Sequence, residues 1–182
     1  MKIFIRALMA MGVMFLFVEE CAAQVNVKAG GGFLVDNSRW GGHLSVDIPI
    51  GDTYPTYLAP FVEVYRSTIG PDVHLNEIPF GVNLLYKAPF SEQYGIVYFG
   101  IGAGMLLARG DDVDITDFGG NVIDTISFSA SEPMIAAGGG LMLDVSDAMG
   151  LFFQARWFKA FATGAKNEVA LQVGLSFRLG QE

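Results

Sequence analysis

The clearest pattern in the chain is a strict alternation of apolar and small or polar residues over positions 167–180. A period of two over about a dozen residues indicates a β-strand with one apolar and one polar face. The strand is longer than the usual 5–6 residues or so, and it suits the roughly 9–11 residues that a tilted strand needs to cross a bilayer. We therefore predict the closing strand of a membrane barrel, with these residues facing lipid: Val169, Leu171, Val173, Leu175, Phe177 and Leu179.

Seven earlier segments show the same alternation, which makes eight candidate strands in the chain. The sequence therefore predicts an all-β protein, an eight-stranded antiparallel up-and-down transmembrane β-barrel that forms one domain over residues 24–182. An even strand number places both ends of the barrel chain on one side of the membrane, so the long connection 109–130 is expected on the extracellular side. The predicted strands are 25–35, 40–50, 57–69, 78–87, 94–108, 133–145, 150–161 and 167–180.

The N-terminus has the three parts of a secretory signal peptide. Lys2 and Arg6 precede an apolar run over 7–18, which is too short to span a bilayer as a helix. Small residues follow at 21–23, so we expect residues 1–23 to be cleaved. The only cysteine, Cys21, would leave with this segment, and the mature chain would then contain no disulfide.

Composition narrows the class of protein further. The chain is 52% hydrophobic with a mean hydropathy of +0.41, yet its only long apolar run is at the N-terminus, as expected when apolar residues are spread over alternate strand positions. Many of the 23 glycines fall inside predicted strands, where inward glycines are expected to let strands bend and to leave space for large neighbours. The net charge of −8 argues against nucleic acid as a partner.

The signal peptide, the glycine-rich stretch YFGIGAGM at 98–105 and the closing strand together resemble the small outer-membrane barrels of the opacity-protein and OmpA/OmpX type. The resemblance extends over the mature chain as a pattern. It implies a location in the bacterial outer membrane, insertion by the outer-membrane assembly machinery, and contact with outer-membrane lipids and lipopolysaccharide. The family usually ends on an aromatic residue, whereas here Phe177 is followed by five more residues.

The polar faces of the predicted strands carry charges of both signs. The interior of an eight-stranded barrel is just wide enough for side chains to fill, and enclosed charges must be paired or hydrated. We therefore expect a filled, salt-bridged lumen and not an ion path, with Glu63 or Asp47 meeting Arg156 or Arg178. The predicted lumen charges are Lys28, Asp47, Glu63, Lys87, Asp144, Arg156, Glu168 and Arg178.

The long connection 109–130 is predicted to form an exposed hairpin. Two β-prone runs at 115–118 and 122–125 flank a Gly-Gly-Asn turn, so strands 94–108 and 133–145 are expected to continue outside the membrane as an acidic ribbon. The free edge of a ribbon can pair with another chain, which makes this hairpin the predicted contact for a surface protein or a host partner. No metal is expected, because the spacing lacks the glycine and terminal glutamate of an EF-hand. The acidic residues are Asp111, Asp112, Asp114, Asp117 and Asp124.

His43, Ser45 and Asp47 share one face of a predicted strand and carry the residue types of a hydrolase triad. Alternate residues of a strand lie about 7 Å apart, which is too far for a direct nucleophile–base hydrogen bond. We therefore expect no catalytic site and no cofactor, and a structural or surface-interaction role in adhesion or envelope integrity. Three alternatives stay open: a narrow channel for small solutes, a lipid-acting hydrolase using His43 and Ser45, and a secreted lipocalin-like barrel with an apolar interior.

Aromatic residues near the ends of the predicted strands are expected to lie at the membrane–water interfaces, where aromatic girdles form. They are Trp40, Tyr57, Tyr86, Phe90, Tyr94 and, nearer the middle of its strand, Trp157.

Overall fold

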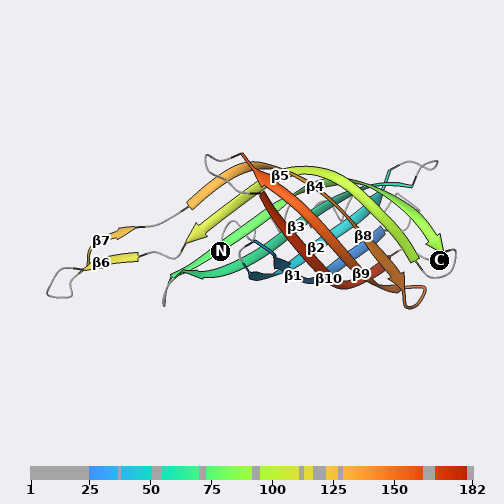
Figure 1. Cartoon of the computed structure of the whole chain (residues 1–182), viewed down its shortest axis with the longest axis horizontal. Coiled ribbons are helices and arrows are strands. Elements are labelled where there is room, and N and C mark those ends of the chain that lie inside the picture. The colour runs from blue at the N-terminus through green and yellow to red at the C-terminus, as the bar shows by residue number, and fades with distance from the viewer. Residues whose placement is uncertain are drawn as a thin grey trace.

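The chain forms a closed antiparallel β-barrel in a computed structural model (Figure 1). The structure describes residues 25–36, 38–50, 55–69, 73–91, 95–110, 113–116, 122–126, 129–161 and 167–179. The predicted signal peptide, residues 1–23, lies outside these ranges. Among the described residues, no helix has the length and apolar character needed to cross a membrane. The barrel strands are β1 (Val25–Leu34), β2 (Arg39–Pro49), β3 (Thr56–Ile69), β4 (Val73–Ser91), β5 (Gly95–Gly110), β8 (Ser129–Asp144), β9 (Met149–Ala160) and β10 (Asn167–Leu179).

Each barrel strand pairs with the barrel strands that precede and follow it in the chain, and β1 pairs with β10 to close the sheet. In the closing pair, Val27 lies opposite Phe177 and Ala29 opposite Leu175. The predicted all-β, eight-stranded antiparallel barrel with sequential strand order is therefore confirmed.

The two faces of the wall follow the alternation in the sequence. On β10, Leu171 and Val173 are 50% and 49% exposed on the outside, whereas Ala170 and Gln172 are buried inside. The same division holds on β3, where Val64 is exposed and Glu63 is buried. A polar, charged interior inside an apolar surface is the reverse of a lipocalin-like barrel, so that alternative is not supported by the fold.

Two strands begin several residues before the predicted alternation. β4 spans Val73–Ser91 instead of 78–87, and β8 begins at Ser129 instead of 133. On β4 the outward positions before Ile78 hold His74 and Asn76, so the apolar alternation ends before the strand does. Because β4 begins at Val73, Pro79 lies inside the ladder, opposite Leu106, and not at the start of the strand.

The residues 113–126 contain a second, two-stranded sheet, formed by β6 (Val113–Thr116) and β7 (Val122–Ile126). Asp114 pairs with Thr125 and Ile115 with Asp124, which confirms the predicted hairpin. The expected continuous extension of the two flanking barrel strands is wrong, because β6 and β7 form a sheet of their own. Of the five acidic residues predicted for the hairpin, Asp114 and Asp124 lie in its strands. The other three lie outside the described residues.

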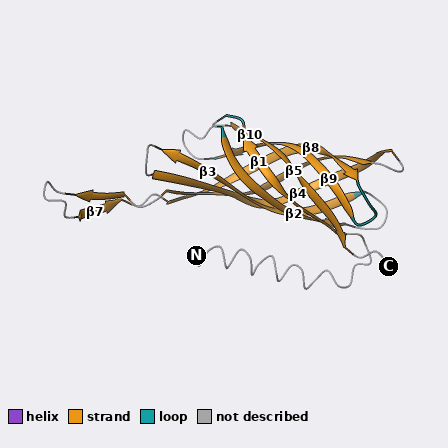
Figure 2. Ribbon diagram, turned by 90° about the horizontal axis from the view of Figure 1, so that it is seen from below, coloured by secondary structure: helices purple, strands orange, loops and turns teal. Residues whose placement is uncertain are grey.

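The barrel has two distinct ends, which are visible in Figure 2. We call the end at which β5 stops and β8 starts the hairpin end, because the β6–β7 sheet lies beyond it. We call the opposite end, at which β1 begins and β10 finishes, the terminal end.

Three of the aromatics predicted for the membrane–water interfaces lie on the outer surface of the barrel. Trp40, Tyr86 and Phe90 are exposed on the outer surface. The expectation for Tyr57 is wrong, because its ring lies under the Lys87 ammonium at 4.0 Å, inside the lumen. Tyr57 is the second residue of β3, and so close to a strand end the alternation of apolar and polar residues is too short to predict which face an aromatic side chain occupies. Tyr94 lies outside the described residues, and Trp157 is half-buried.

Glycine makes room for the largest lumen side chains, as the sequence predicted. A Cβ atom on Gly41 would overlap the ring of Tyr65 and the carbonyl oxygen of Val64. Similarly, a Cβ atom on Gly140 would lie 2.8 Å from the Tyr98 hydroxyl. Because these two glycines have no side chain, the rings of Tyr65 and Tyr98 can lie directly against the barrel wall.

Adjacent glycines therefore give a matched test of the lumen packing. We expect Gly41→Ala to destabilise the folded barrel by about 1–3 kcal/mol, because a well-packed site accepts an added methyl only by strain. Gly42→Ala is the control, because a Cβ atom there would have its nearest neighbour at 3.9 Å. Urea unfolding of both variants in lipid vesicles measures the difference, and equal stability of the two would contradict the packing of Tyr65 on Gly41.

Candidate functional site

The lumen contains two clusters of buried charge. In the first, the carboxylate of Asp47 on β2 lies between two lysines, with Lys28 Nζ at 3.1 Å from Oδ1 and Lys87 Nζ at 2.7 Å from Oδ2. The same ammonium groups lie over aromatic rings, Lys28 over Tyr98 at 4.4 Å and Lys87 over Tyr57 at 4.0 Å. The single carboxylate balances only one of the two lysine charges. Because ring faces stabilise desolvated cations, the two tyrosine rings help to stabilise the remaining positive charge. We call these five residues the Asp47 cluster.

The second cluster surrounds Glu63 on β3, whose side chain is 0% exposed. Its Oε1 accepts hydrogen bonds from Arg156 and from His43 Nδ1, the latter at 3.1 Å, and its Oε2 accepts one from the Tyr65 hydroxyl at 3.0 Å. The Arg156 guanidinium also lies 3.4 Å from the centre of the Phe61 ring. Three donors on one carboxylate offset much of its desolvation cost. We call these five residues the Glu63 cluster.

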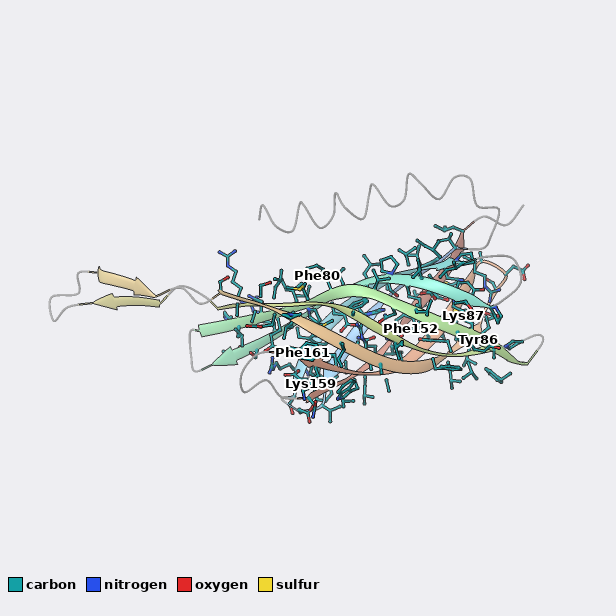
Figure 3. The ribbon with its side chains drawn as sticks, turned by 90° about the horizontal axis from the view of Figure 1, so that it is seen from above. Phe80, Tyr86, Lys87, Phe152, Lys159 and Phe161 are labelled. Carbon is teal, nitrogen blue, oxygen red and sulfur yellow. The ribbon has the colours of Figure 1, made fainter. Side chains whose placement is uncertain are left out.

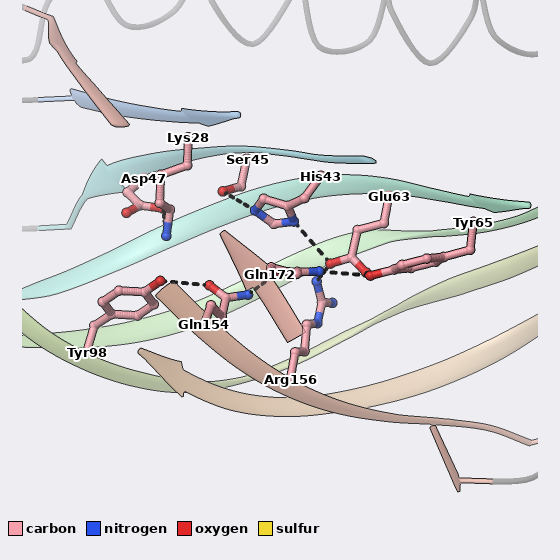
Figure 4. Close-up of polar contacts among 10 residues, drawn as sticks. All are labelled: Lys28, His43, Ser45, Asp47, Glu63, Tyr65, Tyr98, Gln154, Arg156 and Gln172. Carbon is pink, nitrogen blue, oxygen red and sulfur yellow. Dashed lines mark hydrogen bonds and ion pairs between the residues drawn. The ribbon is translucent and has the colours of Figure 1, made fainter. Parts of the chain in front are cut away.

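A chain of side-chain hydrogen bonds joins the two clusters (Figure 4). The Gln172 amide donates to the Tyr65 oxygen at 3.0 Å, and the Gln154 amide donates to Gln172 at 2.9 Å. The Tyr98 hydroxyl then donates to the Gln154 oxygen at 3.0 Å. The two clusters therefore belong to one polar network, which ties strands from both halves of the chain together.

Further ion pairs lie near the two ends of the barrel. Arg178 pairs with Asp144 towards the terminal end. Towards the hairpin end, Arg39 pairs with Glu77 and lies 3.6 Å from Glu168. Every charge predicted for the lumen thus has an ion-pair partner, and the pair of Glu63 with Arg156 is one that the sequence proposed. What the network does for the protein stays a prediction.

Two charged residues of the lumen, Arg39 and Glu77, were missed by the sequence analysis. Arg39 falls one residue before the predicted strand 40–50, and Glu77 one residue before the predicted strand 78–87. Because both strands begin earlier than the apolar alternation, these side chains point into the lumen instead of lying in turns. Their opposite charges were the available signal, but their pairing needs the register across β2, β3 and β4.

His43 and Ser45 lie closer together than expected. The Ser45 hydroxyl is 3.0 Å from His43 Nε2, and His43 Nδ1 is in turn 3.1 Å from Glu63. The expectation that residues two apart on a strand cannot hydrogen-bond is wrong here, because the imidazole reaches along the strand and closes the gap between the backbones. The acidic partner is Glu63 and not Asp47, which is bound to lysines.

This serine–histidine–glutamate arrangement resembles the relay of a hydrolase, but its surroundings do not suit that chemistry. The adjoining cavity has a volume of about 20 Å³, which is room for one water molecule and not for an acyl group. Arg156 also holds the carboxylate that would orient the histidine. The cavity lies between the two charge clusters, and members of both, including Lys28, His43 and Arg156, contribute to its polar lining.

Metal ligands are not gathered in this part of the molecule. Within the described ranges, no group of three or more His, Cys, Asp or Glu side chains is placed to hold a metal ion.

Comparison with solved structures defines the class of fold. The crystal structure of Neisserial surface protein A matches 87% of this chain and 98% of its own, with a TM-score of 0.60 and 15% identity. Ail, the attachment invasion locus protein of Yersinia pestis, crystallised with the heparin analogue sucrose octasulfate, matches 86% and 98% with a TM-score of 0.57 and 14% identity. A major outer membrane protein of Thermus thermophilus covers 87% and 100% with a TM-score of 0.55 and 15% identity.

The chain therefore has the fold of the small eight-stranded outer-membrane barrels over most of its length. At these identities the likeness concerns the fold. No protein-family model matches the sequence, and no curated protein matches it.

Proposed function

We propose that the protein is an integral, non-catalytic barrel of the bacterial outer membrane, which acts through a surface hairpin in adhesion or envelope integrity. The observation that carries this proposal is the β6–β7 sheet beyond the hairpin end of a barrel whose lumen is filled (Figure 2). A signal peptide over residues 1–23 and insertion by the outer-membrane assembly machinery belong to the same proposal.

The outer surface supports membrane insertion. Apolar side chains cover the outward positions of the strands, and the wall has no unpaired strand edge because β1 and β10 close it. A closed barrel satisfies all of its backbone groups internally, which hydrocarbon requires. The proposed surroundings are accordingly outer-membrane lipids and lipopolysaccharide.

The lumen supports a filled barrel over the alternative of a narrow solute channel. Both charge clusters are mixed in sign and buried, whereas selective pores carry rings of one sign. The large side chains of Tyr65, Phe152 and Phe158 are also fully buried inside.

The hairpin supports an interaction role because a two-stranded sheet has two free edges. Such an edge offers backbone donors and acceptors to a strand of another protein. Asp114 and Asp124 give the hairpin negative charge, so a basic partner segment on another surface protein or on a host cell would complement it. The names of Neisserial surface protein A and of the attachment invasion locus protein are compatible with this role.

A matched pair of protease sites tests the proposed exposure. We expect a site inserted after Gly110 to be cut by external protease on intact cells, because the hairpin end faces outward in the proposal. The same site inserted after Asp147, in the turn between β8 and β9, should be protected because it lies at the terminal end. Replacing residues 111–128 by a short Gly-Ser linker should then abolish attachment to cultured host cells while the barrel stays heat-modifiable on a gel. Cleavage after Asp147 alone, or attachment that is unchanged by the linker, would reject the proposal.

A further inference from the structure

A row of polar side chains crosses the outer surface at the hairpin end. Arg66 on β3 lies opposite Asn76 on β4, which lies opposite Arg109 on β5, so the three are neighbours across adjacent strands. All three occupy outward positions, and both arginines are exposed. On the other side of Arg66, the row continues to Trp40 on β2.

This row lies where the apolar surface ends. Two residues closer to the middle of the barrel, the outward positions of the same strands are apolar. They hold Val64 on β3, Ile78 on β4 and, opposite Ile78, Leu107 on β5. Trp40 is 74% exposed, and its ring packs against that of Phe33 with the ring centres 4.8 Å apart and the planes tilted by 52°. Exposed tryptophans concentrate at the level of lipid headgroups, so the row that begins at Trp40 is expected near the level of the headgroup phosphates.

The outer surface is asymmetric in charge. Arg66, Arg109 and Lys159 are the outward-facing basic residues of the described barrel strands, and all three lie towards the hairpin end (Figure 3 for Lys159). Towards the terminal end, the outward positions carry side chains such as Tyr86, Phe90 and Phe177. No Asp or Glu faces outward on the described barrel strands to neutralise the three cations.

The two arginines also differ from those of the lumen. Arg39, Arg156 and Arg178 all have carboxylate partners. In the described part of the chain, neither Arg66 nor Arg109 has an ion-pair partner. An unpaired guanidinium on a protein surface can bind a phosphate through two parallel hydrogen bonds.

We propose that Arg66, Asn76 and Arg109 form a binding site for a phosphate group of lipopolysaccharide in the outer leaflet. Neighbouring strands lie about 4.8 Å apart, so the backbones of the two arginines are about 10 Å apart and their long side chains can converge on one phosphate. The Asn76 amide between them supplies a further donor. The indole of Trp40 supports the glucosamine ring and acyl chains that adjoin the phosphate. This inference rests on the proposed outer-membrane location, with the hairpin end outward.

The test uses the purified full barrel in nanodiscs, titrated with bisphosphorylated lipid A and followed by native mass spectrometry. We expect Arg66→Gln/Arg109→Gln to lower the affinity at least tenfold, because the double variant lacks both guanidinium groups that make charge-assisted hydrogen bonds to the phosphate. Lys159→Gln is the matched control, because it removes an outward cation at the same end but outside the row, and it should change the affinity less than twofold. Exposed positions leave the fold intact, which heat-modifiability on a gel verifies.

The chemical specificity is tested with two other lipids. Dephosphorylated lipid A and phosphatidylglycerol should bind the wild type at least tenfold more weakly than the bisphosphorylated form. Equal affinity of the double variant and the wild type, or equal binding of all three lipids, would overturn the site. Loss of the lipid site in this titration leaves the hairpin proposal standing, because the protease experiment on cells does not depend on it. Unchanged attachment after the linker replacement would reject the hairpin role alone, whereas cleavage only after Asp147 would place the row in the inner leaflet and reject both proposals.

Discussion

Replacing Glu63 by glutamine is expected to destabilise the folded barrel by about 3–5 kcal/mol, because removal of one partner leaves a buried charge uncompensated. The Arg156 guanidinium would remain enclosed against Phe61, with its principal ion-pair partner gone. The amide of glutamine has nearly the shape of the carboxylate, so the loss reports charge and hydrogen bonding more than packing. His43 and Tyr65 would each lose a charged acceptor as well.

Reversible urea unfolding in lipid vesicles, followed by tryptophan fluorescence, measures this effect. Asp144→Asn is the matched control, because its pair with Arg178 is more accessible, with side chains 23% and 15% exposed. We expect this control to cost less than about 1 kcal/mol. Combining Glu63→Gln with Arg156→Met should recover part of the stability, since the uncompensated cation is then removed. Equal losses in Glu63→Gln and Asp144→Asn would show that the Glu63 cluster is hydrated.

A positive charge on the outer wall at mid-strand should have the next largest effect. We expect Leu171→Arg to cost about 2–4 kcal/mol, the range for arginine at the bilayer midplane on the lipid face of a barrel. Leu171 is 50% exposed near the middle of β10, so the substitution changes the contact with lipid and not the packing of the lumen.

Val35→Arg provides the comparison for this second effect. Val35 is 46% exposed in the turn after β1, at the hairpin end, where the cost should fall to about 0–1 kcal/mol. The same urea titration in vesicles compares the two variants. If Leu171→Arg and Val35→Arg unfold at the same urea concentration, the outer wall of β10 does not face hydrocarbon.

The strands and their facing were predictable because both follow from the backbone. Successive side chains of a strand point to opposite faces, so the alternation on β10 identifies the strand and its lipid side at once. Where the outward residues become polar, as at His74 and Asn76 on β4, the signal stops although hydrogen bonding continues. The ends of strands were accordingly the least predictable part of the fold.

The lumen partners were predictable by charge but not by position. Glu63 and Arg156 lie on β3 and β9, and their contact depends on the tilt and stagger of the whole barrel. The hydrogen bond between His43 and Ser45 depends on side-chain rotation, which strand spacing does not contain. Pairings across a closed sheet therefore need the full register, which no single stretch of sequence carries.

The pair of Glu63 with Arg156 also has a consequence for biogenesis. The carboxylate belongs to the part of the chain made first, whereas the guanidinium lies in the next-to-last strand, 93 residues later. A half-made sheet that entered the bilayer would expose Glu63 to hydrocarbon without its counter-ion, which is strongly unfavourable. The same ionic contact that stabilises the mature wall therefore penalises the entry of β3 into hydrocarbon before β9 has joined the sheet, so we expect the two strands to enter the membrane together.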